Sequence, residues 1–184
     1  MAKLDVSKST STQKEEILKL AAGVRRFEIE RFWSRSIFFW GFISAAFLAY
    51  AQLYGKQSDD DLRFVVACFG FVCSVAWTLL NRGGKYWQEA WEGKVQSVET
   101  EVLGVPLFSN HEPLRHTGLW GAARFSVSRL TIALSDFTVL IWLALVLKAA
   151  PPEVRLGSNC LFLVVTGVTC LYVVSLFIGG RSRD

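Results

Sequence analysis

Hydrophobic residues gather into four long stretches, and charged residues are concentrated between them. The stretches are residues 36–54, 62–80, 130–149 and 160–178. Each approaches the roughly 20 apolar residues that a helix needs to cross a hydrocarbon core about 30 Å thick. None shows the alternation of polar and apolar positions that marks a lipid-facing strand. The pattern predicts an all-α integral membrane protein with four transmembrane helices. It disfavours a soluble bundle, whose helices would each keep a polar face.

The basic residues predict how these spans are oriented. Of the 20 Lys and Arg residues, sixteen lie in segments 1–35, 81–129 and 179–184, and four lie toward the opposite ends of the spans. Lys and Arg accumulate in cytoplasmic segments, so we expect both termini and the central loop in the cytoplasm and the spans in a bacterial inner membrane. Residues 1–35 lack the apolar core of a cleavable signal peptide, so the stretch 36–54 is expected to direct insertion.

The N-terminal tail carries the spacing of an amphipathic helix. Apolar side chains recur three or four residues apart, as at Leu20, Val24 and Phe27. Thr12 stands three residues before a glutamate, the pattern of a capping box at a helix start. We expect a helix that begins at about Thr12 and runs into the first span.

A second amphipathic helix is expected in the central loop, over residues 85–102. Its apolar face comprises Trp87, Trp91, Val95, Val98 and Val102. Glu99 and other acidic side chains fall off that face. The preceding Gly83 and Gly84 are expected to separate this helix from the second span, because glycine weakens a helix interior.

The two cytoplasmic helices are expected to form a collar through which subunits meet. A helix that adsorbs to lipid headgroups usually has a basic polar face, whereas the helix 85–102 carries more acidic than basic residues there. Packing against protein is therefore favoured over packing against lipid. The residues expected at these contacts are Phe27, Trp87, Trp91 and Val95.

Asp136 is the one acidic residue well inside a predicted span. An acid at mid-span costs roughly 2.5–3.5 kcal/mol on insertion scales, so its side chain is expected to face protein or water. Polar residues at similar depth in the other spans are Ser44, Ser74, Tyr172 and Ser175. Two interpretations stay open. Asp136 is either a functional acid that bonds within this set or lines a cytoplasm-facing cavity, or a structural acid hydrated from the interface.

Small residues mark places where helices approach closely. Gly41, Ala45 and Ala49 lie four residues apart on one stripe of the first span, and Gly70 and Ser74 repeat that spacing in the second. The stripes predict helix packing, either within one subunit or between subunits.

Residue types that often carry chemistry form no recognisable constellation. The four cysteines lie in the predicted spans without a C-x-x-C pair, which favours small buried hydrophobes. His111 and His116 flank a proline in a predicted loop, where a solvated loop is favoured over a metal site. The sequence has no glycine-rich phosphate loop and no nucleophile elbow. We therefore expect no enzyme and no cofactor. We also expect no nucleic-acid binding, because the positive charge follows membrane sidedness.

Three short motifs occur in order from the end of the second span to the start of the third. They are NRGGKYWQEAWEGKVQSVE at residues 81–99, GVPLF at 104–108 and FSVSRL at 125–130. In this arrangement the chain resembles the RipA family of bacterial inner-membrane proteins, small four-span proteins described as octameric. The first and fourth spans agree only in kind, and residues 110–124 depart from the family loop. The resemblance implies a ring-like homo-oligomer of eight subunits and brings no catalytic residues.

These observations predict a scaffold or an envelope-stress or adaptation factor that acts through its cytoplasmic collar. Its expected partners are further copies of itself, membrane lipids and a cytoplasmic protein. An ion channel or small-solute transporter with Asp136 lining the path is the alternative.

Overall fold

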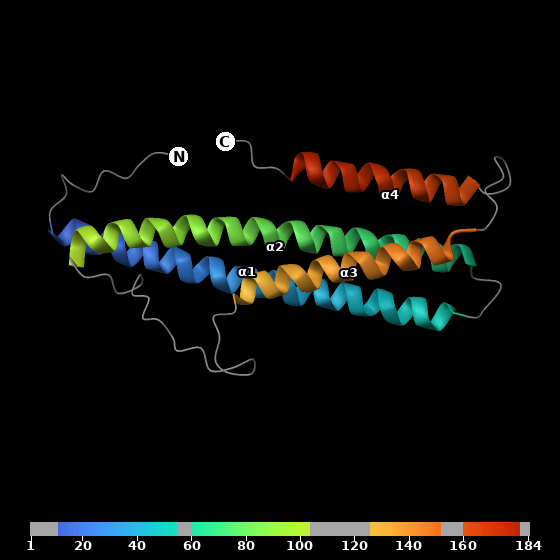
Figure 1. Ribbon diagram of the computed structural model, residues 1–184, viewed down its shortest axis with the longest axis horizontal. Helices are drawn as coiled ribbons and strands as arrows, with labels where there is room; N and C mark the ends of the chain where they lie inside the picture. The colour runs from blue at the N-terminus through green and yellow to red at the C-terminus, as the bar shows by residue number, and fades with distance from the viewer. Residues whose placement is uncertain (1–10, 55–59, 104–125, 152–159, 181–184) are drawn as a thin grey trace, which may run out of the picture. The chain divides into compact units, whose positions relative to one another are not determined.

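The computed structural model describes residues 11–54, 60–103, 126–151 and 160–180. These residues form four helices, and all regular structure within them is helical. The helices are α1 (Ser11–Leu53), α2 (Asp60–Leu103), α3 (Val127–Ala149) and α4 (Cys160–Gly179) (Figure 1). Each contains a window long and apolar enough to cross a membrane, with mean hydropathy from 1.5 in α1 to 2.5 in α4. The four apolar stretches are therefore helices, as predicted.

α1 and α2 continue well beyond their apolar stretches. α1 has 43 residues and runs from the N-terminal tail through the first span without a break, as predicted. α2 has 44 residues and joins the second span to the helix expected over residues 85–102. Gly83 and Gly84 therefore do not separate two helices, and that prediction is wrong. At about 1.5 Å per residue, each helix is roughly 65 Å long, about twice the thickness of a hydrocarbon core.

The packing of Gly84 explains why α2 continues through the glycine pair. A Cβ atom at Gly84 would lie 3.0 Å from Cδ2 of Phe32 on α1, whereas one at Gly83 would meet nothing within 4 Å. Phe32 is buried. Glycine in a helix interior costs about 1 kcal/mol relative to alanine, and at position 84 the close approach of the Phe32 ring offsets that cost.

The contacts divide the chain into two units. The first unit comprises Met1–Trp33 and Gly83–Arg129, and the second comprises Ser34–Arg82 and Leu130–Asp184. The second unit holds the apolar stretches of all four helices, and the first holds the N-terminal part of α1 and the C-terminal part of α2.

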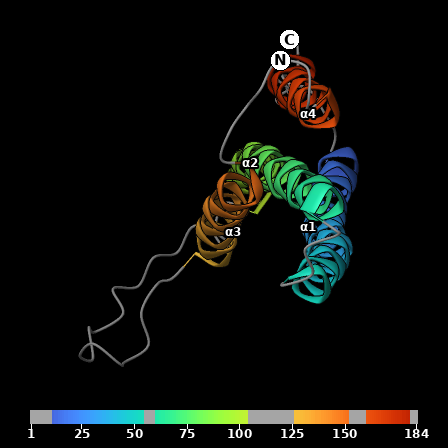
Figure 2. The same cartoon turned by 90° about the vertical axis from the view of Figure 1, so that its right-hand side faces the viewer.

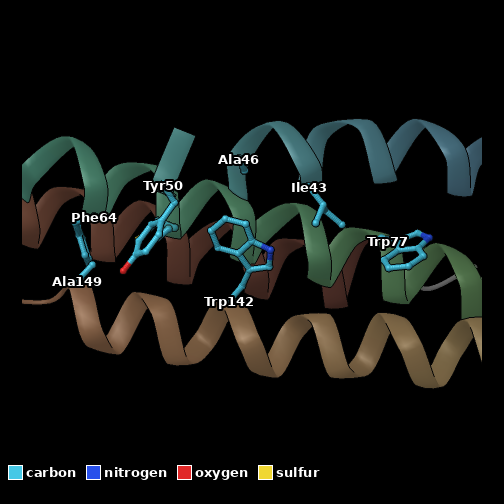
Figure 3. Packing of buried hydrophobic residues seen from close by; sticks show 9 residues of the cluster. Ile43, Ala46, Tyr50, Phe64, Trp77, Trp142 and Ala149 are labelled. Atoms are coloured by element: carbon cyan, nitrogen blue, oxygen red, sulfur yellow. The ribbon is translucent and has the colours of Figure 1, made fainter. Parts of the chain in front are cut away.

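Trp142 is the centre of the core of the second unit. Its side chain is fully buried and extends from α3 toward α1 and α2 (Figure 3). Its ring centroid lies 4.4 Å from that of Phe47, and an added Cβ at Gly70 would overlap the indole ring. The other buried members of the cluster are Ile43, Ala46 and Tyr50 of α1, Phe64, Ala67, Cys68 and Trp77 of α2, and Ala149 of α3. Three helices thus share one apolar core.

A polar contact lies between α1 and α2 in the same unit. Trp77 Nε1 donates to Ser36 Oγ at 3.4 Å, and Ser36 Oγ donates to Asn81 Oδ1 at 3.4 Å. All three side chains are buried. A polar pair within an otherwise apolar helix seam penalises every shifted alignment, so this contact fixes the register of α1 against α2.

α4 packs more loosely than the other three helices. None of its residues is buried. Its clearest ring contact joins Phe162 to Phe64 of α2, with centroids 4.8 Å apart. Within the second unit, α4 lies beside the spans of the other helices rather than among them (Figure 2).

Polar contacts join α1 and α2 in the first unit. Arg25 Nη2 lies 3.2 Å from Glu92 Oε1, which also accepts a hydrogen bond from Gln88 Nε2 at 3.2 Å. Ser128 Oγ, at the start of α3, donates to Gln88 Oε1 at 3.1 Å. Ala21, Phe32 and Val95 are the buried apolar residues of this unit among those that the structure describes.

Candidate functional site

Asp136 is paired with an arginine. Nη2 of Arg82, on α2, donates to Asp136 Oδ2, on α3, at 2.7 Å. The short distance is typical of a charge-assisted hydrogen bond. The two side chains keep 56% and 40% of their surface exposed, respectively. The acid that the sequence places inside the third span is thus neutralised by a neighbour.

A groove of about 570 Å³ begins at this ion pair. Its other lining residues are Val75, Thr78 and Leu79 of α2, Val139 and Leu140 of α3, and Phe177 of α4. Apart from the ion pair, the only polar group on these side chains is the hydroxyl of Thr78, which has no hydrogen-bond partner among the described residues. The groove is therefore apolar along its length and charged at one end.

The four polar residues expected near Asp136 do not gather around it. Ser74 Oγ donates to the carbonyl of Gly70 at 2.8 Å, and Ser175 Oγ donates to the carbonyl of Tyr172 at 2.8 Å. Ser44 is exposed on α1. Tyr172 lines a separate apolar groove between α2 and α4. In Ser74 and Ser175 the hydroxyl bonds to its own helix, a common arrangement for such residues in spans.

The expected collar residues take different positions in the first unit. Val95 is buried and Trp91 is half-buried, with Lys94 Nζ 4.1 Å from the centre of its ring. Trp87 and Phe27 stay exposed, at 38% and 49%. Val95 therefore belongs to packing within the chain, whereas Trp87 and Phe27 present apolar surface outward.

Glu99 corrects the predicted division of the second amphipathic helix. It was expected on the polar face, yet only 1% of it is exposed. The buried stripe passes through Gly84 and Val95 rather than Trp87, and Glu99 follows Val95 by four residues, one helical turn. The prediction placed Trp87 on the buried face because its side chain is large and apolar, and this turned the predicted face away from the one that is buried. Val98 and Val102 lie outside the described side chains.

The small residues of the first two spans also divide into a buried set and an exposed set. Gly70 and Ser74 are buried, and Gly70 contacts Trp142. Gly41 and Ala45 are exposed and Ala49 is half-buried. An added Cβ at Gly41 meets nothing within 4 Å. The stripe of the second span is used within the chain, while most of the stripe of the first span faces away from the core.

Two cysteines depart from their expected burial. Cys68 is buried and Cys73 is half-buried, but Cys160 and Cys170 are exposed on α4. All four are free thiols. Within the described residues, no three His, Cys, Asp or Glu side chains are grouped as metal ligands. His111 and His116 lie outside the described residues.

Sequence reasoning missed the role of Arg82. It was assigned to the cytoplasmic loop, because it follows the last apolar residue of the second span by two positions. A signal was nevertheless present. Val75, Leu79 and Arg82 are spaced by four and three residues, so a helix that continued past Leu80 would place the guanidinium on the same face as two apolar residues.

The chain is similar to a known protein family. The chain matches the octameric membrane protein family (8xMP) over residues 15–151. This range contains α2 and α3 completely and all but the first four residues of α1, and it ends before α4. No curated protein and no solved structure matches the chain.

Proposed function

Because this chain belongs to the octameric membrane protein family, we propose that it is a non-enzymatic homo-octameric scaffold of the bacterial inner membrane. Its first unit supplies a cytoplasmic collar. In the cytoplasm, this collar joins the subunits and presents a surface to a cytoplasmic protein. An envelope-stress or adaptation role fits such a scaffold.

One observation carries this proposal: the first unit keeps large apolar side chains exposed outside the apolar stretches. Leu20, Phe27 and Trp87 are 69%, 49% and 38% exposed. Phe27 precedes the first span by nine residues and Trp87 follows the second by seven, which is roughly 10–14 Å of helix. Exposed apolar surface that is not covered by lipid marks protein–protein contact.

A conducting path through Asp136 has less support. A lone acid in a polar passage would attract cations, but Asp136 shares its charge with Arg82 at 2.7 Å. The groove beside the pair is apolar, and an apolar surface gives an ion no replacement for its hydration shell. The scaffold is therefore the better-supported function.

The collar is tested by placing a charge in its exposed apolar surface. We expect Phe27→Asp and Trp87→Asp each to shift the purified protein from octamers to smaller species, because a buried unpaired charge costs several kcal/mol at an interface. Native mass spectrometry gives the subunit number. Ser97→Asp is the matched control, since Ser97 is an exposed residue of α2. Octamers that persist in both aspartate variants would reject the collar contact.

A further inference from the structure

We propose that the groove between α2, α3 and α4 binds one acyl chain of an anionic phospholipid, whose phosphate is held by Arg82. This inference concerns the second unit alone and does not depend on the collar.

The shape and lining of the groove fit an amphiphile. Its volume of about 570 Å³ lies within the range of roughly 300–1,000 Å³ of small-molecule pockets. From Arg82 to Val75 the α2 wall runs seven residues, or about 10 Å along the helix. Over that length α3 contributes Val139 and Leu140, and α4 contributes Phe177. A hydrocarbon chain matches this surface, whereas water and ions do not.

The charged end of the groove selects the headgroup. A guanidinium has five N–H donors, and Arg82 gives one of them to Asp136 at 2.7 Å. Its side chain is 56% exposed, so further donors are accessible to a second acceptor. Guanidinium and phosphate form paired, charge-assisted hydrogen bonds. Asp136 fixes the position of Arg82 and does not itself bind the lipid.

The position of Arg82 along α2 agrees with an anionic phospholipid as the ligand. It lies two residues beyond the last apolar residue of the second stretch, at the end of α2 that the basic residues assign to the cytoplasm. Anionic lipids are enriched in the cytoplasmic leaflet, and Lys and Arg at this level attract them. A second copy of the chain is a different occupant for the groove, and the experiments below distinguish it from a lipid.

The test compares lipids that differ only in the headgroup. The full-length protein is purified as its native oligomer and titrated with phosphatidylglycerol or phosphatidylethanolamine of identical acyl chains. Native mass spectrometry counts the bound lipids. We expect phosphatidylglycerol to bind more tightly and Arg82→Gln to weaken it about tenfold, the effect of losing one charge-assisted contact. Arg129→Gln, which removes an exposed arginine of α3 that does not line the groove, is expected to have little effect.

A second pair of variants tests the acyl-chain part of the groove. Val139→Trp places an indole in the groove, whereas Leu143→Trp introduces the same side chain one turn further along α3, at a position that does not line it. We expect the first to reduce binding of phosphatidylglycerol and the second to leave it unchanged. The double variant Arg82→Gln with Asp136→Asn removes both charges together. Lost lipid binding in that variant is therefore not due to an unpaired acid.

Three outcomes overturn the proposal. Equal binding of the two lipids with no effect of Arg82→Gln excludes a phosphate site at Arg82. Unchanged lipid binding in Val139→Trp excludes the acyl chain from the groove. Dissociation of the oligomer by Val139→Trp, with no lipid retained by the unaltered protein, identifies a neighbouring copy as the occupant.

Discussion

Gly70 and Trp142 depend on each other for their places in the core. The indole of Trp142 is fully buried and occupies the space where a Cβ of residue 70 would lie. Ser74, one turn further along α2, is also fully buried. Protein interiors are packed without spare volume, so the largest side chain of α3 requires the smallest residue on α2.

We expect Gly70→Ala to destabilise the second unit by about 1–3 kcal/mol, the usual cost of overpacking a core. For a chain of this size that lowers Tm by roughly 2–4 °C per kcal/mol, which thermal unfolding in detergent measures. Gly167→Ala is the control, because an added Cβ there meets nothing within 4 Å. Adding Trp142→Leu to Gly70→Ala should cost less than the sum of the two single changes. Additive costs would show that the two residues are independent.

Asp136 shows what sequence reasoning provides at the scale of one residue. The cost of an acid in a span indicated that Asp136 faces protein or water, and its carboxylate pairs with Arg82. To identify the partner, one must know which face of α2 meets α3 and where α2 ends. Neither can be obtained from composition. Hydroxyl groups at similar depth were therefore proposed as hydrogen-bond partners of Asp136, and Arg82 was missed.

At the scale of elements, apolar stretches were predictable and helix continuity was only partly so. The stretch 160–178 differs from α4 by one residue, because it is mostly apolar and contains no charged residue. α1 was expected to be continuous, and it is. α2 was not expected to be continuous, because the prediction considered the low helix propensity of glycine but not the contact between Gly84 and Phe32. Tertiary contact overrides propensity in such cases.

The two adjacent glycines of α2 provide a matched test of this explanation. Gly83→Ala is expected to stabilise the protein by about 0.5–1 kcal/mol, since alanine is the better helix former and its Cβ meets nothing. Gly84→Ala is expected to give no such gain, because Phe32 has to move. Thermal unfolding of the two variants side by side measures the difference. Equal stabilisation in both would mean that Gly84 has no packing role.

For the whole molecule, membership of an octameric family means that the surfaces of one chain include those that meet its neighbours. Gly41 and Ala45 lie on the face of α1 that points away from its own core. Small residues allow backbones of neighbouring helices to approach closely in a membrane. We propose this stripe as a contact between subunits in the spans, with the collar as a second contact outside them.

Gly41→Leu and Ala45→Leu should therefore reduce the fraction of octamer several-fold while the isolated chain keeps its helical content. Native mass spectrometry and far-UV circular dichroism report these two properties. Gly167→Leu adds the same side chain to an exposed position of α4, outside the range that matches the family, and is expected to leave the octamer intact. If all three variants remain octameric, the stripe faces lipid.

The loose packing of α4 has a consequence for how the protein is made. Among the described residues, the buried cluster around Trp142 ends at Ala149, eleven residues before α4 begins at Cys160. Synthesis proceeds from the N-terminus, so every buried member of that cluster has been synthesised before α4 is translated. With mean hydropathy of 2.5, α4 can partition into the bilayer by its own composition. Phe162 and Val165 of α4 then pack against buried residues that α1, α2 and α3 have already supplied.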